Sequence, residues 1–287
     1  ESRSYDAGGN TLSLGTAREF DYNDAGRMGL VRNGGVIAME YAYNGRGERV
    51  QKRLGAPKTQ ALYDEAGHWL GDYGNSGVVS QQAIWMDDMP IGVLDNGQLY
   101  YIQSDHLGTP RIVIHPANDA AIWEWQSKGE PFGNTPPQQD VDGDGTLFIL
   151  DFRMPGQRAV DVSQLSHNGF RDYDPTTGRF TQSDLTGLAD GPSTYTYGQS
   201  DPLRKYDPSG LATATMPWVT SPTYNWTAVR MAAGRLGPVA FAGTTGWAVG
   251  TGVSNGYEYA FGDSIGGEIA DLVNASANMT SPITLVG

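Results

Sequence analysis

The chain has 287 residues, an apolar fraction of 39% and a formal net charge of −13. This length allows one large or two ordinary domains. The negative charge argues against nucleic acid as a partner, because phosphate binding needs clustered Lys and Arg. The absence of cysteine excludes a disulfide framework and thiolate chemistry. The 39 glycines and 15 tyrosines are typical of many short strands joined by tight turns.

A repeat with a period of about 20 residues occupies residues 1–80. In each unit a tyrosine is followed directly by Asp or Asn, and four positions later by glycine; the tyrosines are Tyr5, Tyr22, Tyr43 and Tyr63. The Asp or Asn side chain can bind the backbone two residues on, and glycine can take the left-handed position of a hairpin turn. We therefore expect stacked antiparallel β-hairpins. The alternative is an ordinary antiparallel sheet with similar turns. Four units are too few to enclose a cavity, so we expect further repeats before Glu1.

Residues 81–211 have a different sequence pattern. The period weakens, helix-like periodicity is scarce, and four distinctive strings appear. They are Tyr100 to Arg111, Arg153 to Gln157, Asn168 to Asp184, and Asp207-Pro208-Ser209-Gly210-Leu211.

An acidic segment between these strings has the spacing of a calcium loop. Asp140, Asp142, Asp144, Thr146 and Asp151 fall at positions 1, 3, 5, 7 and 12 of an EF-hand-like pattern. Position 12 is Asp rather than the usual bidentate Glu, and no flanking helices are evident. The two interpretations are a calcium site and a solvated loop.

The composition changes again directly after Leu211. Residues 212–287 contain no His and no Lys, and residues 236–257 carry no charge and are rich in glycine. Gly246 and Gly250 match the small-xxx-small spacing that packs helices in membranes. We expect a helical or disordered segment that is the front part of a toxin. The alternatives are a membrane-permeabilising toxin and a glycine-rich linker.

The repeats and the four strings together resemble the Rhs repeat-associated core domain of bacterial Rhs/YD-repeat polymorphic toxins, over about residues 1–211. The same domain type occurs in the C component of insecticidal toxin complexes. The resemblance implies a mainly β fold, in which a shell of antiparallel YD-repeat hairpins is closed by a core-associated plug. It divides the chain into YD repeats (1–80), an autoprotease domain (81–211) and a toxin or pre-toxin segment (212–287).

The resemblance also implies an aspartic-type site that cuts its own chain once, between Leu211 and Ala212. The catalytic carboxylates map onto Asp184 and Asp207, and the cleavage motif includes Pro208 and Gly210. Two carboxylates can hydrolyse a peptide without a metal, one activating water and the other protonating the leaving amine. No cofactor is implied. From the residues alone, Asp207 to Leu211 is equally well an ordinary turn.

The family further implies a bacterial protein that is made in the cytoplasm and delivered to competing cells, for example by type VI secretion. The expected partners are its own cleaved C-terminal segment, an immunity protein and the secretion machinery. The alternative from a different class is a non-catalytic YD-repeat structural or adhesion scaffold.

Overall fold

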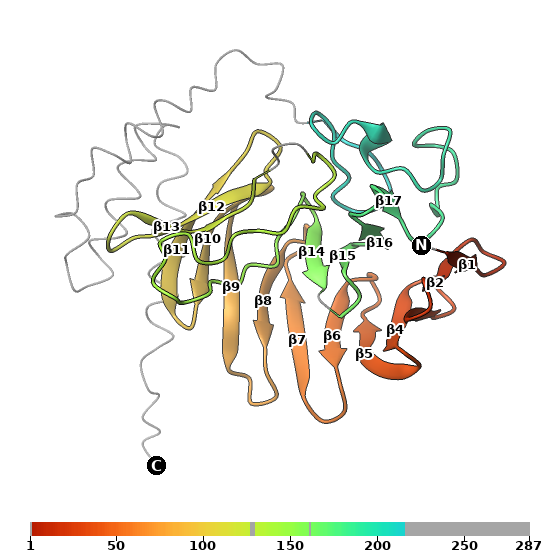
Figure 1. The fold of residues 1–287 in the computed structure, drawn as a ribbon, viewed down its shortest axis with the longest axis horizontal. Helices are drawn as coiled ribbons and strands as arrows, with labels where there is room; N and C mark the ends of the chain where they lie inside the picture. The colour runs from red at the N-terminus through yellow and green to blue at the C-terminus, as the bar shows by residue number, and fades with distance from the viewer. Residues whose placement is uncertain (1, 127–129, 161, 216–287) are drawn as a thin grey trace. The chain divides into compact units, whose positions relative to one another are not determined.

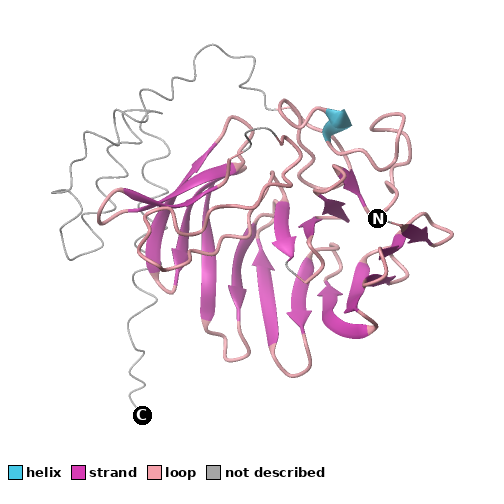
Figure 2. Ribbon diagram, viewed as in Figure 1, coloured by secondary structure: helices cyan, strands magenta, loops and turns pink. Residues whose placement is uncertain are grey.

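The computed structural model describes residues 2–126, 130–160 and 162–215 and consists almost entirely of antiparallel β-structure (Figures 1 and 2). Thirteen strands form one sheet in which each strand pairs with the next along the chain. They are β1 (Arg3–Tyr5), β2 (Thr11–Leu14), β3 (Arg18–Tyr22), β4 (Met28–Asn33), β5 (Val36–Tyr43), β6 (Arg49–Arg53), β7 (Lys58–Tyr63), β8 (Trp69–Tyr73), β9 (Val79–Met86), β10 (Met89–Asp95), β11 (Gln98–Ser104), β12 (Pro110–His115) and β13 (Ala120–Glu124). The expectation of a mainly β fold built from antiparallel hairpins is confirmed.

A second, four-stranded sheet follows along the chain. Its strands are β14 (Gln157–Val160), β15 (Leu165–Asn168), β16 (Arg171–Asp174) and β17 (Arg179–Phe180). The only helical element of the described residues is the short 3₁₀ turn η1 (Gly198–Ser200). Within this described part, no helix is long and apolar enough to span a bilayer.

The large sheet passes residue 80 without interruption, because β9 spans Val79–Met86. The expected segment boundaries at residues 80 and 211 stay predictions. The expected helical, disordered or membrane-inserting character of the tail concerns residues 216–287, which lie outside the described residues.

The expected hairpin turns share one hydrogen-bond pattern. After Tyr22, Asn23 Oδ1 accepts the backbone N–H groups of Ala25 and Arg27, both at 3.0 Å. Gly26 takes a φ of +70°, which glycine adopts without a steric penalty. A β-bulge lies at each of the repeat tyrosines, Tyr5, Tyr22, Tyr43 and Tyr63. The local pattern therefore bends each strand directly before its turn.

The repeat tyrosines also link successive hairpins. From the second unit onward, each repeat tyrosine donates its hydroxyl to the backbone carbonyl that lies six residues after the preceding repeat tyrosine. The pairs are Tyr22 to Thr11 (2.8 Å), Tyr43 to Met28 (2.7 Å) and Tyr63 to Arg49 (3.1 Å). These bonds give a hydrogen-bond donor to carbonyl groups close to the bulges. The tyrosine of a unit is therefore needed for its contact with the preceding hairpin.

The same pattern continues beyond the four expected units. Trp85 Nε1 donates to the carbonyl of Trp69 at 2.9 Å, in the position of the next tyrosine hydroxyl. Further along, Asp105 Oδ1 accepts the N–H groups of Leu107 and Thr109, as Asn23 does in its own turn. The period weakens in the sequence because other residues occupy the positions of the tyrosine.

The second sheet packs against the large sheet through apolar and charged contacts. The main buried cluster combines Trp69 and Val93 of the large sheet with Tyr173 and Phe180 of the small one. Three ion pairs also join the sheets: Arg3–Asp174, Arg49–Asp172 (2.8 Å) and Arg158–Asp72 (3.0 Å). Figure 1 shows β14 and β15 beside β6 to β8; the pair Arg158–Asp72 joins β14 to β8, and the pair Arg49–Asp172 joins β16 to β6. Because two of the carboxylates belong to β16, these contacts fix the strand that carries Arg171.

Candidate active site

The turn from Asp207 to Leu211 is organised by the side chain of its first residue. Asp207 Oδ1 accepts the backbone N–H groups of Gly210 (2.8 Å), Leu211 (3.1 Å) and Ala212 (3.2 Å). The last of these is the amide nitrogen of the predicted scissile bond. One carboxyl oxygen is therefore in contact with the atom that hydrolysis would release as an amine.

The β15–β16 hairpin holds this turn from the other side. Asn168 Nδ2 donates to the carbonyl of Asp207 at 2.7 Å, and the N–H of Phe170 donates to that of Ser209 at 2.8 Å. Arg171 Nε donates to the carbonyl of Gly210 at 2.5 Å. Three contacts to carbonyl groups between residues 207 and 210 leave this part of the backbone with little freedom.

Glycine makes this close approach possible. A Cβ atom added to Gly156 would collide with the backbone of Pro208, and one added to Gly169 would collide with that of Ser209. Both glycines also have positive φ, at +80° and +56°, a region that L-residues with side chains rarely adopt. Two separate turns are therefore shaped to receive the cleavage loop.

Arg171 brings the two predicted catalytic carboxylates together. Its Nη2 atom lies 2.8 Å from Asp184 Oδ2 and 3.2 Å from Asp207 Oδ2. Its guanidinium carbon lies 3.6 Å from the ring centre of Phe180, which covers one face of the group. All three charged residues are buried, with exposures of 2% for Arg171, 8% for Asp184 and 0% for Asp207. One cation thus lies within ion-pair distance of two buried carboxyl groups.

Burial controls the ionisation of this cluster. It raises the pKa of Asp207 above the usual range for a carboxyl group, although Arg171 and the surrounding N–H groups oppose the shift. Burial also lowers the pKa of Arg171, against the effect of both carboxylates. Asp207 therefore retains its proton to a higher pH than an exposed aspartate does.

A hydroxyl group connects Asp184 with the predicted scissile carbonyl. Asp184 Oδ1 accepts hydrogen bonds from Thr186 N (2.7 Å) and Thr186 Oγ1 (2.6 Å). The same Oγ1 atom lies 3.4 Å from the carbonyl oxygen of Leu211. Leu211 is half-buried and Ala212 is exposed, so the bond between them is accessible to water.

The structure thus places Asp184, Asp207, Leu211 and Ala212 at one position, with Pro208 and Gly210 inside the turn. Arg171 and Thr186 were not assigned a role from the sequence. Arg171 belongs to one of the distinctive strings, but nothing in its position relative to Asp184 indicates that it bridges two carboxylates. Thr186 follows Asp184 by two residues and carries no motif of its own.

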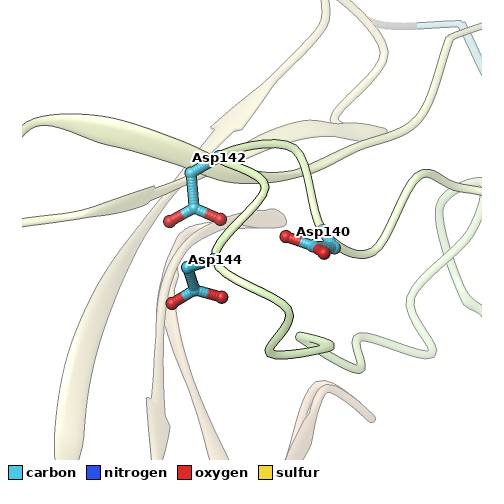
Figure 3. A group of neighbouring side chains, drawn as sticks. All are labelled: Asp140, Asp142 and Asp144. Carbon is cyan, nitrogen blue, oxygen red and sulfur yellow. The ribbon is translucent and has the colours of Figure 1, made fainter.

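The predicted calcium ligands are only partly grouped. The carboxylates of Asp140, Asp142 and Asp144 lie within 4.8 Å of one another (Figure 3). Asp151 instead forms an ion pair with Arg158 at 2.8 Å, and the N–H of Thr146 donates to Asp144. Three oxygen donors of this kind suit a hard cation, and calcium binding stays a prediction.

Known proteins share both the sequence and the fold. The chain is 28% identical to toxin protein Tse5 of Pseudomonas aeruginosa over 42% of its own length and 8% of that protein's. It is 30% identical to the probable deoxyribonuclease RhsB of Dickeya dadantii over 46% of its own length and 9% of that protein's. The chain thus spans less than a tenth of each of these relatives. No family model matches the chain.

Solved structures share the fold. A crystal structure of TcdB2-TccC3 without its hypervariable C-terminal region superposes with a TM-score of 0.55 and 20% identity, covering 72% of this chain and 11% of that one. The fold and the site define a protein of stacked β-hairpins with a buried carboxylate pair at the end of its second sheet. In sequence and in fold, the chain is thus similar to Rhs-type polymorphic toxins.

Proposed function

We propose that this part of the toxin is a self-cleaving peptidase that hydrolyses its own Leu211–Ala212 bond once, by an aspartic-type mechanism. The observation that supports the proposal is the position of Asp207. It is fully buried, it shares Arg171 with Asp184, and its Oδ1 atom lies 3.2 Å from the nitrogen of Ala212.

In this mechanism Asp184 is the general base. It takes a proton from a water molecule, and the water oxygen forms a bond to the carbonyl carbon of Leu211. Thr186 Oγ1 is close enough to the carbonyl oxygen to support the charge that develops there. Because the substrate is part of the same chain, its effective concentration is high and a modest rate acceleration is sufficient.

Asp207 is the general acid. Burial favours its protonated form by raising its pKa, and in that form it gives the proton to the nitrogen of Ala212 while the carbon–nitrogen bond breaks. The products are a new carboxyl group on Leu211 and a new amine on Ala212. The reaction leaves Asp184 protonated and Asp207 ionised, and a single turnover does not require their reset. The rate should therefore fall as pH rises through the pKa of Asp207.

The released segment, residues 212–287, is in this proposal the start of an effector used against competing cells. The chain is made in the bacterial cytoplasm and then delivered by a secretion machinery, and an immunity protein protects the producing cell. The relatives named as toxins support this role.

Denaturing electrophoresis and intact-mass measurement test the cleavage. The wild-type chain should give two fragments that meet between Leu211 and Ala212. Asp184→Asn and Asp207→Asn should each give one intact chain, because each removes a proton-transferring group. Asp24→Asn, at an exposed turn position, is the matched control and should cleave like wild type. A single full-length band from the wild-type chain would contradict the proposal and favour the scaffold alternative.

A further inference from the structure

The residues that follow the predicted cut are held by the same part of the chain that holds the cleavage loop. Thr213 makes two hydrogen bonds to one carboxylate: its N–H donates to Asp190 Oδ1 at 3.1 Å, and its hydroxyl donates to Asp190 Oδ2 at 2.6 Å. A bidentate contact of this type recognises a hydroxylated side chain as well as the backbone.

Ala214 is held by a short stretch of β-pairing. The N–H of Tyr206 donates to the carbonyl of Ala214 at 3.1 Å, and the N–H of Ala214 donates to that of Tyr206 at 2.7 Å. Ala214 also packs on a small apolar cluster formed by Leu107 and Tyr206. A larger side chain at this position would have to displace that cluster.

Asp190 is itself held in place. Gln199 Nε2 donates to the carbonyl of Asp190 at 3.2 Å and to its Oδ1 at 3.3 Å. Lys205 Nζ in turn donates to Gln199 Oε1 at 2.5 Å. The Asp190 carboxylate is therefore oriented before it contacts Thr213. Little side-chain conformational entropy is lost when the contact forms.

We infer that Asp207, Asp190 and Tyr206 form a binding groove for the new N-terminus of the product, which keeps segment 212–287 attached after its peptide bond is cut. The inference rests on the proposed self-cleavage. Hydrolysis releases the amide nitrogen of Ala212 as an amine beside Asp207 Oδ1, and the proton of the new Leu211 carboxyl group converts that amine into an ammonium group. The contact changes from a neutral hydrogen bond into a charge-assisted one, which is about twice as strong. The ligand is thus a free ammonium group followed by a hydroxylated residue and a small residue.

The test measures how fast the cleaved segment leaves the rest of the chain. The full-length protein is allowed to cleave completely, as seen on a denaturing gel, then diluted, and the two pieces are separated under native conditions at successive times. Thr213→Val keeps the shape of the side chain and removes the hydroxyl. We expect it to release the segment about tenfold faster than wild type, which corresponds to about 1.4 kcal/mol. Asp190→Asn should act in the same direction, and Thr213→Ser should restore slow release.

A second measurement uses the charge of the new N-terminus. An α-amino group loses its proton at about pH 8, so release from wild type should accelerate as pH rises above that value. Equal release rates for wild type, Thr213→Val and Asp190→Asn would overturn the inference. Failure of the proposed cleavage would appear differently, as an intact wild-type chain on the denaturing gel.

Discussion

At the scale of single residues, Arg171 explains why two distant aspartates share one site. Its guanidinium contacts Asp184, Asp207 and the carbonyl of Gly210 at the same time. Burying an ionised group is expensive unless it is paired, and here one cation contacts both carboxyl groups. Asp184 and Asp207 keep different second partners, a threonine hydroxyl and a row of backbone N–H groups. The two carboxyl groups are therefore chemically distinct, as an acid and a base must be.

Thr186 provides a prediction at this scale. Thr186→Val removes the hydroxyl between Asp184 and the Leu211 carbonyl and keeps the side-chain shape. We expect self-cleavage to slow by about tenfold, equivalent to about 1.4 kcal/mol of transition-state stabilisation. The measurement is the rate at which the full-length band disappears. Thr186→Ser keeps the hydroxyl and should recover most of the rate; cleavage of Thr186→Val at the wild-type rate would show that the hydroxyl is not used.

At the scale of elements, turns determine where the cleavage loop lies. The turn at Gly156 and the β15–β16 turn at Gly169 both contact residues 208–209 through positions where a Cβ atom does not fit. The glycine in the turn between β10 and β11 of the large sheet has a different environment. Gly97 has a φ of +81° and open space around it. Glycine is therefore required there only by the backbone conformation of the turn.

These two glycine environments give a matched pair of variants. Gly156→Ala and Gly97→Ala impose the same backbone strain, because their φ angles are nearly equal, and that strain costs about 1 kcal/mol. Only Gly156→Ala also displaces Pro208. We expect it to slow self-cleavage at least tenfold, while Gly97→Ala cleaves normally with a small loss of stability. Denaturing gels report the first effect and urea unfolding the second. Equal cleavage by the two variants would mean that the contact does not position the loop.

At the scale of the described fold, buried charges join the two sheets. Arg49 pairs with Asp172 at 2.8 Å, with both residues buried. His167 lies beside this pair, 3.6 Å from Asp172. Burial and the nearby Arg49 lower the pKa of His167 to about 4. Burial alone would raise the pKa of Asp72, but Arg158 and Lys52 lower it to about 2. The contact between the sheets therefore favours a neutral histidine and ionised carboxylates.

This arrangement predicts acid-sensitive stability. The unfolded chain protonates His167 near pH 6.5 and the folded chain only near pH 4, so the unfolded state binds more protons in that window. The free energy of unfolding should then fall as pH decreases from 6.5 to 4, by up to about 1.4 kcal/mol per pH unit. A second loss follows between pH 3.8 and 2, where Asp72 takes up its proton.

Urea unfolding across this pH range tests the prediction, using Asp184→Asn as the background so that the chain stays intact. His167→Gln should flatten the dependence between pH 6.5 and 4. His106→Gln, at an exposed histidine, is the control and should retain the wild-type slope. If His167→Gln also retained that slope, the buried histidine would not be the cause.

Local chemistry made the hairpins predictable from the residues. Each turn depends on a Tyr, an Asp or Asn, and a glycine within five positions, and the bonds between them recur wherever that pattern occurs. Two continuations of the pattern, at Trp85 and Asp105, were not recognised because the tyrosine is replaced. Strand β9 also crosses residue 80. The repeat pattern of the sequence weakens there, but the antiparallel pairing of the strands continues.

The candidate site depends on contacts between segments far apart in the chain. The residues predict the cleavage loop and the aspartate pair by resemblance, but they do not indicate that Arg171 joins the pair or that Asp190 holds Thr213. They likewise do not indicate that Asp151 turns away from the acidic loop to Arg158. Hydrogen bonds within a turn are determined by neighbouring residues. The ion pair between Arg49 and Asp172, 123 positions apart, forms only when the two sheets pack, so the tertiary structure alone determines which of these charges meet.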